Sequence, residues 1–461
     1  MTGRQEGATE VAMATERSPS TVPAGATRDG ETPGRYAWVE PTIWTPRMVQ
    51  ALDEGVKGGR WYSLMDKVLT PRSLEAAFAR VKANKGGAGV DHMTIETFER
   101  NKARHLTTLH ESLRDGTYRP SPIRRCYIPK AGSKELRPLG IPTVRDRVVQ
   151  TALRAAIEPI FEREFADHSY GFRPQRSAKM ALQRVDHLLR QGYLWVVDVD
   201  LKSYFDSVPH APLMALVRRR IADGRALDLI EAFLKQPIQD GDRRWIPTVG
   251  TPQGAVVSPV LSNLYLDGLD HHMAQAGFEM TRYADDLVIQ CQTEEAARAA
   301  LEEVTRWCGQ AGLTVHPTKT RLVQVSVTEG FDFLGFHFRL RRAEPGGTNR
   351  WPRKKSVAKL RDTLRPLTRR MIGISLKSVI QGVNRVLRGF FAYFRSSLKS
   401  SLVSIDAWVR NRLRSVLRKR HKHRGRARGL DMTRWDNAFF RKQGLFSLAG
   451  AQAEAAHSPR G

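Results

Sequence analysis

Cysteine is scarce in this chain, and the cysteines present form no recognisable site. The 461 residues include Cys126, Cys291 and Cys308, with no CxxC spacing and no Cys/His cluster. Neither a disulfide framework nor a zinc site is indicated, and a reducing compartment is expected. No apolar run is long enough to span a membrane and the N-terminus has no hydrophobic signal core, so the sequence predicts a cytoplasmic protein.

Acidic residues are also few relative to basic ones. The chain has 75 Lys and Arg against 47 Asp and Glu, a formal net charge of +28, and residues 341–430 alone hold 26 basic and 3 acidic residues. Such an excess favours a polyanionic partner, because basic side chains that neutralise phosphates release counterions. Nucleic acid is expected ahead of the alternative, an anionic membrane surface, and no membrane partner is predicted.

The patterning divides the chain into successive segments. Residues 1–58 are rich in Gly, Pro, Thr, Ala and Ser without a sustained apolar period, which predicts a mostly disordered leader. Residues 59–191 alternate helical patterns with basic turns. Residues 192–340 alternate short apolar strands with helices, which is typical of an α+β fold.

Residues 341–430 have apolar residues at the spacings i, i+3, i+4 and i+7, which predicts a helical bundle. Its basic side chains, among them Arg410, Arg414 and Arg418, are expected largely on the outer face as nucleic-acid contacts. The alternative is a solvated charged face, but solubilising surfaces usually mix both signs. Residues 431–461 are left as a short tail.

Two adjacent aspartates, Asp285 and Asp286, stand among apolar residues in RYADDLVIQ (282–290). Strands are predicted on both sides, so Ala284 and Asp285 form a hairpin turn. Like charges this close repel, and burial of an unpartnered carboxylate is costly. A cation is therefore expected beside them.

A second acidic strand lies upstream in YLWVVDVDLKSYFDSV (193–208). Alternation along a strand places Asp198 and Asp200 on one face. If this strand neighbours the hairpin, Asp200 converges with the aspartate pair, and two Mg²⁺ ions would keep the carboxylates ionised and serve phosphoryl transfer. Asp198 and Asp206 are interpreted as capping or turn residues.

Further motifs follow in order along nearly the whole chain from Trp61. They are NKGGAGVDH (84–92), IPKAGSKELRPLGIPTVRDRVVQTAL (128–153), HSYGFRPQRSAKMAL (168–182), TPQGAVVSP (251–259), YADD (283–286), LTVHPTK (313–319) and FLGF (333–336). With the strand that carries Asp200, they resemble the group II intron-encoded reverse transcriptases, also called maturases. The resemblance implies an α+β right-hand polymerase with fingers (59–191), an antiparallel palm sheet (192–340) and a helical, basic thumb and maturase domain (341–430).

The resemblance also implies roles for individual residues. Asp200, Asp285 and Asp286 match the catalytic carboxylates that hold two Mg²⁺ ions. The matching substrate-binding residues are Lys130 and Arg137 for the incoming triphosphate, Phe205 as the aromatic that excludes a ribose 2′-hydroxyl, Gln253 and Gly254 at the nascent base pair, and Lys319 near the departing pyrophosphate. Phe205 could instead be a core aromatic and Lys319 a simple phosphate contact. Arg173 and Arg176 are expected to contact an RNA backbone.

The implied function is RNA-directed DNA polymerisation from deoxynucleoside triphosphates on an RNA template and a DNA primer or target. Binding of group II intron RNA for splicing and mobility would accompany it. No cysteine follows Cys308, so an HNH endonuclease is not expected and the chain resembles class C-like members. Two alternatives stay open: a splicing maturase with a vestigial polymerase, and a reverse transcriptase of the retron or diversity-generating type.

Overall fold

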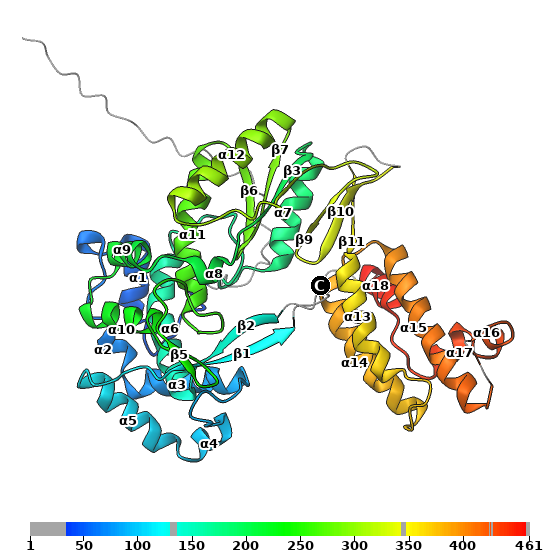
Figure 1. Cartoon of the computed structure of the whole chain (residues 1–461), viewed down its shortest axis with the longest axis horizontal. Helices are drawn as coiled ribbons and strands as arrows, with labels where there is room; N and C mark the ends of the chain where they lie inside the picture. Colours follow the sequence, from blue (N-terminus) through cyan, green and yellow to red (C-terminus); the bar gives the residue numbers. More distant parts are fainter. Residues whose placement is uncertain (1–33, 130–135, 343–346, 424, 426, 458–461) are drawn as a thin grey trace, which may run out of the picture. The chain divides into compact units, whose positions relative to one another are not determined.

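The computed structural model describes residues 34–129, 136–342, 347–423, 425 and 427–457. Val39–Gly461 form one compact unit, distinct from Met1–Trp38, and Figure 1 labels its elements. Within the described residues, no helix is both long enough and apolar enough to cross a membrane.

The first part of the larger unit is mainly helical and contains one β-hairpin. Its elements are α1 (Pro46–Glu54), the 3₁₀ helix η1 (Lys57–Gly59), α2 (Met65–Val68), α3 (Pro71–Ala83), α4 (Ile95–Arg100), α5 (Lys102–Arg114), β1 (Ile123–Pro129), β2 (Leu136–Ile141), α6 (Val144–Glu162) and α7 (Ala178–Arg190). The buried helix α6 packs against α2 and α3. It provides the apolar centre of this region.

The expectation of a disordered leader is wrong for residues 39–58. Helix α1 lies in this range, with Thr45 as its N-cap and Pro46 at its first turn, a favourable helix start. Trp44 is 2% exposed and its indole Nε1 donates to the carbonyl of Ala155 at 2.9 Å. This anchoring is non-local, so composition alone did not reveal it; residues 1–33 lie outside the described range.

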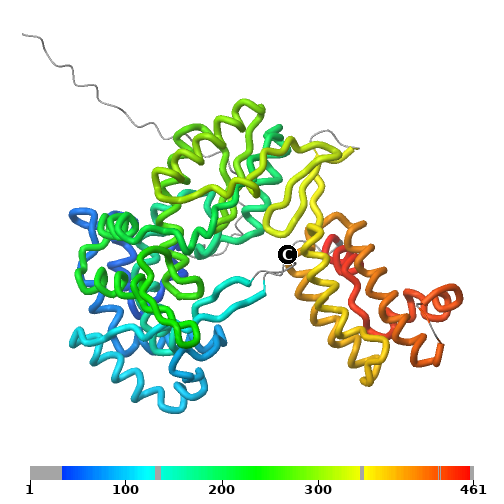
Figure 2. Tube along the Cα trace, viewed as in Figure 1, coloured from blue at the N-terminus to red at the C-terminus, as the bar shows by residue number. Residues whose placement is uncertain are grey.

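Segments distant in sequence meet next to this anchor. The backbone N–H of Trp61 donates to the carbonyl of Arg220, and the N–H of Ala222 donates to the carbonyl of Trp61. Figure 2 shows the corresponding blue and green parts of the chain side by side. The N-terminal helices are thereby joined to the middle of the chain.

The middle of the chain contains the sheet that bears the aspartates. Its elements are β3 (Trp195–Asp200), α8 (Tyr204–Ser207), α9 (His210–Arg220), α10 (Gly224–Leu234), β4 (Ile238–Asp240), β5 (Arg243–Trp245), α11 (Ser258–Gln275), β6 (Glu279–Tyr283), β7 (Asp286–Cys291), α12 (Glu294–Gln310) and β8 (Arg321–Gln324). The antiparallel sheet has the order β6-β7-β3-β8. Helices α7, α11 and α12 pack on it.

The predicted hairpin is confirmed, because β6 ends at Tyr283 and β7 begins at Asp286 with these two residues paired. The strand with Asp200 is its direct neighbour, as the sequence required for convergence. A second sheet, β2-β1-β4-β5, joins the β1–β2 hairpin to the middle region through parallel pairing of β1 with β4. The mixed α+β class is confirmed.

The basic segment begins with a strand rather than a helix. Its strands and helices, with the two strands before it, are β9 (Phe331–Phe333), β10 (Phe336–Leu340), β11 (Thr348–Pro352), α13 (Lys354–Leu367), α14 (Leu376–Phe394), α15 (Lys399–Arg420), α16 (Asp431–Arg434), α17 (Asn437–Lys442) and α18 (Leu448–His457). The three strands form a sheet of order β11-β10-β9. The helices share one core, which includes Val383, Leu387, Leu402 and Leu413.

The tail after residue 430 is an integral part of this helical bundle. Trp435, Phe440 and Leu448 are buried in its core. The carboxylate of Asp406 accepts hydrogen bonds from the backbone N–H groups of Leu448 and Ala449 at the start of α18. An acidic side chain at a helix N-terminus satisfies otherwise unpaired donors.

Candidate active site

Two strands bring the predicted catalytic carboxylates together. Asp200 on β3 is the cross-strand partner of Asp286 on β7, and directly opposed residues of an antiparallel pair project to the same face. Asp285 occupies the turn between β6 and β7. The three aspartates therefore gather at the end of the sheet where the hairpin turns.

Burial and neighbouring charges shift the pKa of two of these carboxylates, Asp285 and Asp286. Burial raises the pKa of Asp285 above its ordinary value, with the charge of Asp200 adding to the shift and Arg137 opposing it. Desolvation by the surrounding protein, and next the negative charge of Asp285, together raise the pKa of Asp286 to about 6. The residue as a whole is nevertheless exposed at the surface. Two carboxylates with raised pKa values beside a third acidic side chain form a site that favours a cation.

A fully buried ion pair supports the turn that presents Asp285. Arg282 and Asp270 are each 0% exposed, and the Nε of Arg282 donates to both carboxylate oxygens of Asp270 at 2.8 and 3.0 Å. The remaining Nη1 donates to the carbonyl of Ala284 and to the side chain of Asn263, both at 3.0 Å. One guanidinium thus connects helix α11 to the turn.

The backbone of this turn is unusual, which explains the need for support. Ala284 has a φ of +59°, a conformation that non-glycine residues rarely adopt. Gly171 packs so closely that a Cβ there would lie 2.2 Å from the Ala284 nitrogen. The carbonyl of Gly171 also accepts from Asn263 at 2.8 Å. Arg282, Asp270, Asn263 and Gly171 were not among the predicted site residues. The available sequence signal was Arg282, a charged residue within a buried strand pattern.

The LTVHPTK loop closes on the opposite side of Asp200. The backbone N–H of His316 donates to the carbonyl of Asp200 at 2.7 Å. The Nζ of Lys319 lies 3.7 Å from the Asp200 carboxylate, with the lysine side chain 58% exposed. The side chain of Lys319 therefore lies at the edge of the carboxylate site and is largely exposed. Asp198, interpreted as a capping residue, instead pairs with Arg321 of β8 at 2.9 Å.

The expected triphosphate contacts lie on the β1–β2 hairpin. Arg137 at the start of β2 is exposed and is close enough to Asp285 to lower the pKa of that carboxyl. Lys130 lies outside the described residues. Of the two predicted triphosphate contacts, Arg137 therefore contributes positive charge to the carboxylate site, and its contact with a triphosphate stays a prediction.

Phe205 and Gln253 border the same region. The ring of Phe205 contacts that of Phe172 edge to face, with centroids 6.3 Å apart, and its backbone carbonyl accepts from Thr251 at 2.6 Å. The carbonyl of Gln253 accepts from the N–H of Gly140 on β2 at 2.6 Å. Phe172 belongs to GFRPQR and was not predicted to lie beside Phe205.

Gly254 owes its identity to the neighbouring strand. Its φ is +105°, and a Cβ would lie 2.3 Å from the carbonyl oxygen of Gly140. In the structure the close approach is to the backbone of β2, and the approach of a nascent base pair to Gly254 stays a prediction. No side chain larger than hydrogen fits here without moving the hairpin.

The expected RNA contact of Arg173 is not supported by the structure. Its side chain is 2% exposed and donates to the carboxylate of Glu162 and to the carbonyls of Ala166 and Ser169. A side chain so enclosed offers no surface to a phosphate. Arg176 is 23% exposed and pairs with Asp167 at 2.9 Å.

The prediction that Arg414 lies on the outer face of the bundle is wrong. Arg414 is buried, and its Nε donates to the carbonyl of Trp435 at 2.7 Å, because the C-terminal helices cover this part of α15. Arg418 is 16% exposed and pairs with Asp431 at 2.6 Å, while Arg410 is half-buried. The exposed basic side chains of the bundle are instead others, including Lys377 and Arg385 on α14 and Arg395 at its C-cap.

The site suits magnesium in its donor chemistry. Among the described residues, no group of three or more His, Cys, Asp or Glu side chains is arranged to hold a metal ion as it stands. Mg²⁺ is usually bound by one or two protein carboxylates together with substrate phosphates. The mutual repulsion of Asp200, Asp285 and Asp286 fits a cation that arrives with its substrate.

Comparison with known proteins agrees with this geometry. Residues 128–338 match the family model of the reverse transcriptase (RNA-dependent DNA polymerase), and residues 357–435 match that of the group II intron maturase-specific domain. Protein YkfC of Escherichia coli (strain K12) is 34% identical, with the alignment covering 61% of this chain and 84% of YkfC.

Group II intron-encoded protein LtrA of Lactococcus lactis subsp. cremoris is 37% identical over 48% of this chain and 37% of LtrA. The chain therefore matches little more than a third of LtrA. A solved structure titled as a partial Cas6-RT-Cas1–Cas2 complex covers 54% of this chain and 42% of its own, at 24% identity and a TM-score of 0.36.

The chain belongs to the group II intron-encoded reverse transcriptases, the RNA-directed DNA polymerases that carry a maturase-specific domain. The aspartate-bearing sheet lies within the polymerase match, and the maturase match covers most of α13 together with α14, α15 and α16, while α17 and α18 follow it. Nucleic acid is the class of partner that follows.

Removal of the buried ion pair is expected to uncouple stability from activity. Asp270→Asn leaves Arg282 without its counter-charge and should lower the free energy of unfolding by about 3–5 kcal/mol. The double variant Arg282→Met with Asp270→Leu removes both charges and should recover most of that loss. It should still extend primers poorly, because the Ala284 carbonyl has lost its donor.

The measurements are denaturant unfolding and primer extension on the same preparations. A double variant that is both stable and fully active would show that the pair contributes stability alone. Arg298→Met with Glu294→Leu on the exposed face of α12 is the matched control, and it should change neither quantity appreciably.

The raised pKa of Asp286 gives a pH-dependent stability. An acid whose pKa is higher in the folded state stabilises the fold below its unfolded pKa of about 4, and this contribution is lost as pH rises through about 6. Asp286→Asn cannot ionise. Its melting temperature in metal-free buffer should therefore exceed that of the unmutated protein by a margin that widens from about pH 4 to about pH 7.

The exposed Asp362→Asn on α13 serves as the control and should show no comparable widening over this range. A margin for Asp286→Asn that stays constant with pH would contradict the raised pKa.

Proposed function

We propose that this protein copies RNA into DNA from deoxynucleoside triphosphates and also binds its intron RNA to assist splicing and mobility. The observation that carries the first part is the cross-strand pairing of Asp200 with Asp286, with Asp285 in the adjoining turn. Fingers at residues 59–191, palm at 192–340 and thumb with maturase surface from 341 onward are the corresponding assignment. The folded segment from Val39 extends the fingers, and the helices after residue 430 extend the thumb.

Asp200, Asp285 and Asp286 would hold Mg²⁺ delivered with the triphosphate. Bound there, the ions supply charge stabilisation to the attacking and leaving oxygens of an in-line displacement. Arg137, together with Lys130, would bind the triphosphate, for which a guanidinium fork is well suited. Lys319 would meet the departing pyrophosphate, since its ammonium group reaches the edge of Asp200.

Phe205 would act as the steric gate against a ribose 2′-hydroxyl. Phe205 is only half-buried, which favours this role over that of a simple core aromatic. Contacts with Phe172 and with the 251–254 loop support the position of its ring. Arg282 and Asp270 would be positioning residues that act through the turn. A vestigial polymerase is disfavoured, because the described members of the predicted catalytic and substrate set gather around one sheet end.

The RNA-binding part rests on the charge of the helical bundle. The match to the maturase-specific domain covers residues 357–435, where exposed Lys and Arg outnumber acidic residues. Binding of folded intron RNA would use this surface collectively.

Loss of a catalytic carboxylate should separate the two activities. Asp285→Asn removes a charge that holds Mg²⁺ and should reduce primer extension by about a hundred-fold or more, while intron RNA binding stays near the unmutated level. The experiment measures extension of a DNA primer on RNA, RNA affinity and melting temperature on one preparation. A variant that melts normally yet extends primers at the unmutated rate would remove Asp285 from the catalytic site, whereas an unmutated protein that extends no primer would remove the polymerase assignment.

Neutralisation of exposed basic residues on α14 and at its C-cap should weaken RNA binding without affecting the fold. Lys377, Arg385 and Arg395 replaced by Gln should flatten the slope of log affinity against log salt by about 2–3, because each phosphate contact contributes about 0.7–0.9 to this slope. Intron RNA affinity is measured across a salt series.

The matched control is a triple Gln variant of Lys235, Arg298 and Arg306. These residues are equally exposed but already pair with Glu231, Glu294 and Glu303. It removes the same formal charge and should leave the slope nearly unchanged. Equal slopes for the two triple variants would place the RNA surface elsewhere.

A further inference from the structure

The 250–257 loop, which carries Gln253 and Gly254, lies between β5 and α11 and contains no helix or strand of its own. Residues 250–253 line a cavity of about 330 Å³, so this face of the loop is open. Buried backbone groups outside helices and strands need other partners. The position of the loop therefore depends on the hydrogen bonds that it makes with the structure behind it.

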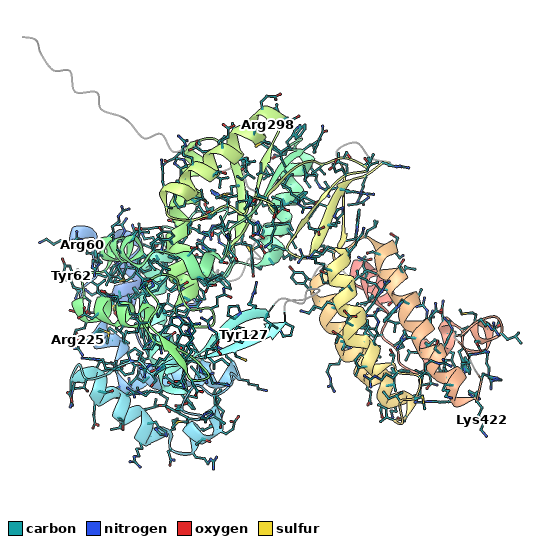
Figure 3. All side chains as sticks on the ribbon, viewed as in Figure 1. Arg60, Tyr62, Tyr127, Arg225, Arg298 and Lys422 are labelled. Atoms are coloured by element: carbon teal, nitrogen blue, oxygen red, sulfur yellow. The ribbon has the colours of Figure 1, made fainter. Side chains whose placement is uncertain are left out.

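Main-chain bonds hold the first part of this loop. The N–H of Thr251 donates to the carbonyl of Phe205 at 2.6 Å. The carbonyl of Gln253 accepts from the N–H of Gly140 on β2, in the hairpin that Figure 3 marks with the label of Tyr127. Because both bonds join main-chain atoms, they do not depend on the identity of a side chain.

The last part of the loop is held by a side chain, that of Gln150 on the buried helix α6. Its Oε1 accepts from the backbone N–H groups of Val256 and Val257 at 2.7 and 3.4 Å. Only an acceptor suits two N–H donors, so the oxygen of the amide must face the loop. Val257 is the N-cap of α11 and its side chain makes no capping bond, as expected of valine. The acceptor comes instead from a residue 106 positions earlier in the chain.

A glutamine is poorly suited to a purely packing role at this position. Gln150 is 0% exposed, and its Nε2 has no hydrogen-bond partner among the residues that the structure describes. A buried donor without a partner lowers stability. An apolar side chain of similar size would fill the same volume without this penalty. The acceptor oxygen at the loop is therefore the contribution that an apolar side chain would not supply.

We propose that Gln150 is a positioning residue that sets nucleotide discrimination. By holding the backbone before α11, it fixes Gln253 and Gly254 against the nascent base pair. Because Gln150 is fully buried, it acts through the loop and not on the substrate. This inference rests on the proposed polymerase function, in which the loop meets the base pair. A displacement of about 1 Å in such a pocket lowers the rate by as much as about a hundred-fold.

The test compares single-nucleotide incorporation by the unmutated full chain and by Gln150→Met, with a DNA primer on an RNA template. Methionine keeps the volume of the side chain but offers no comparable acceptor, so the end of the loop loses its bond. The KM for the matched deoxynucleotide should rise about ten-fold with a smaller change in kcat. The ratio of kcat/KM for matched over mismatched deoxynucleotides should fall by about the same factor.

Gln150→Glu is the rescue variant, because a carboxyl group of the same length keeps an acceptor for both N–H groups. A negative charge there lies at the N-terminus of α11, where it is favoured. Discrimination should stay close to that of the unmutated protein. Gln150→Asn keeps the amide but ends one methylene short of the loop, so it should lose discrimination. It provides the same test if Gln150→Met fails to fold.

Gln290→Met is the matched control. Gln290 on β7 is also a buried glutamine, 1% exposed, and its Nε2 donates to the carbonyl of Val185 at 3.3 Å. Its hydrogen bond does not involve the 250–257 loop. The substitution should lower the melting temperature but leave both the KM and the discrimination unchanged.

Unchanged KM and discrimination in folded Gln150→Met or Gln150→Asn overturn the proposal. So does an equal loss of discrimination in Gln290→Met, which would indicate general loosening of the core, or in folded Gln150→Glu, which keeps the acceptor. All of these outcomes leave the polymerase function intact, because matched nucleotides are still incorporated. An unmutated protein that incorporates no nucleotide removes the polymerase function instead.

Discussion

The ion pair between Arg282 and Asp270 is the interaction on which the candidate active site depends. Its two charges are fully removed from water, so each needs the other and neither can be lost alone without a large penalty. The same guanidinium bonds the Ala284 carbonyl, where the backbone adopts a left-handed conformation. Helix α11, strand β6 and the aspartate turn are thereby fixed as one rigid arrangement.

Rigidity of this turn keeps the carboxylates of the site close together. Burial and the neighbouring carboxylates raise the pKa of Asp285 and of Asp286, and a flexible turn would relax by moving these two residues apart. The buried pair, together with the close packing of Gly171 against Ala284, prevents that relaxation. The repulsion is retained and can be relieved by a bound cation, which is the condition that metal-assisted nucleotidyl transfer requires.

In the helical bundle the repelling charges are positive rather than negative. Its excess of Lys and Arg would repel within a closed core, so most of the charge stays at the surface, where polyanions can reach it. Arg414 is the exception, and it is tolerated because the carbonyl of Trp435 and the side chain of Asn411 accept its hydrogen bonds. The helices after residue 430 supply part of this shell, which makes them structural components of the bundle.

Periodic patterns determined several local elements of this fold from sequence alone. Alternation in WVVDVD and the turn in YADD are local properties, so the aspartate strands and their hairpin were predictable, as was the apolar stripe of α14. The motifs and their order along the chain indicated the family. These features depend on residues that are near one another in sequence.

Only the tertiary structure decided which charged residues serve the fold and which face solvent. Arg173 and Arg414 read as surface cations, yet the chain just before Arg173 folds around that side chain with the carboxylate of Glu162 and the carbonyls of Ala166 and Ser169. Arg414 is enclosed by a segment taken for a tail. The anchoring of Trp44 by Ala155 and the support of the turn by Asp270 are likewise non-local. Burial of a long polar side chain depends on what packs over it and supplies its hydrogen bonds, and the local pattern of a single sequence does not encode that.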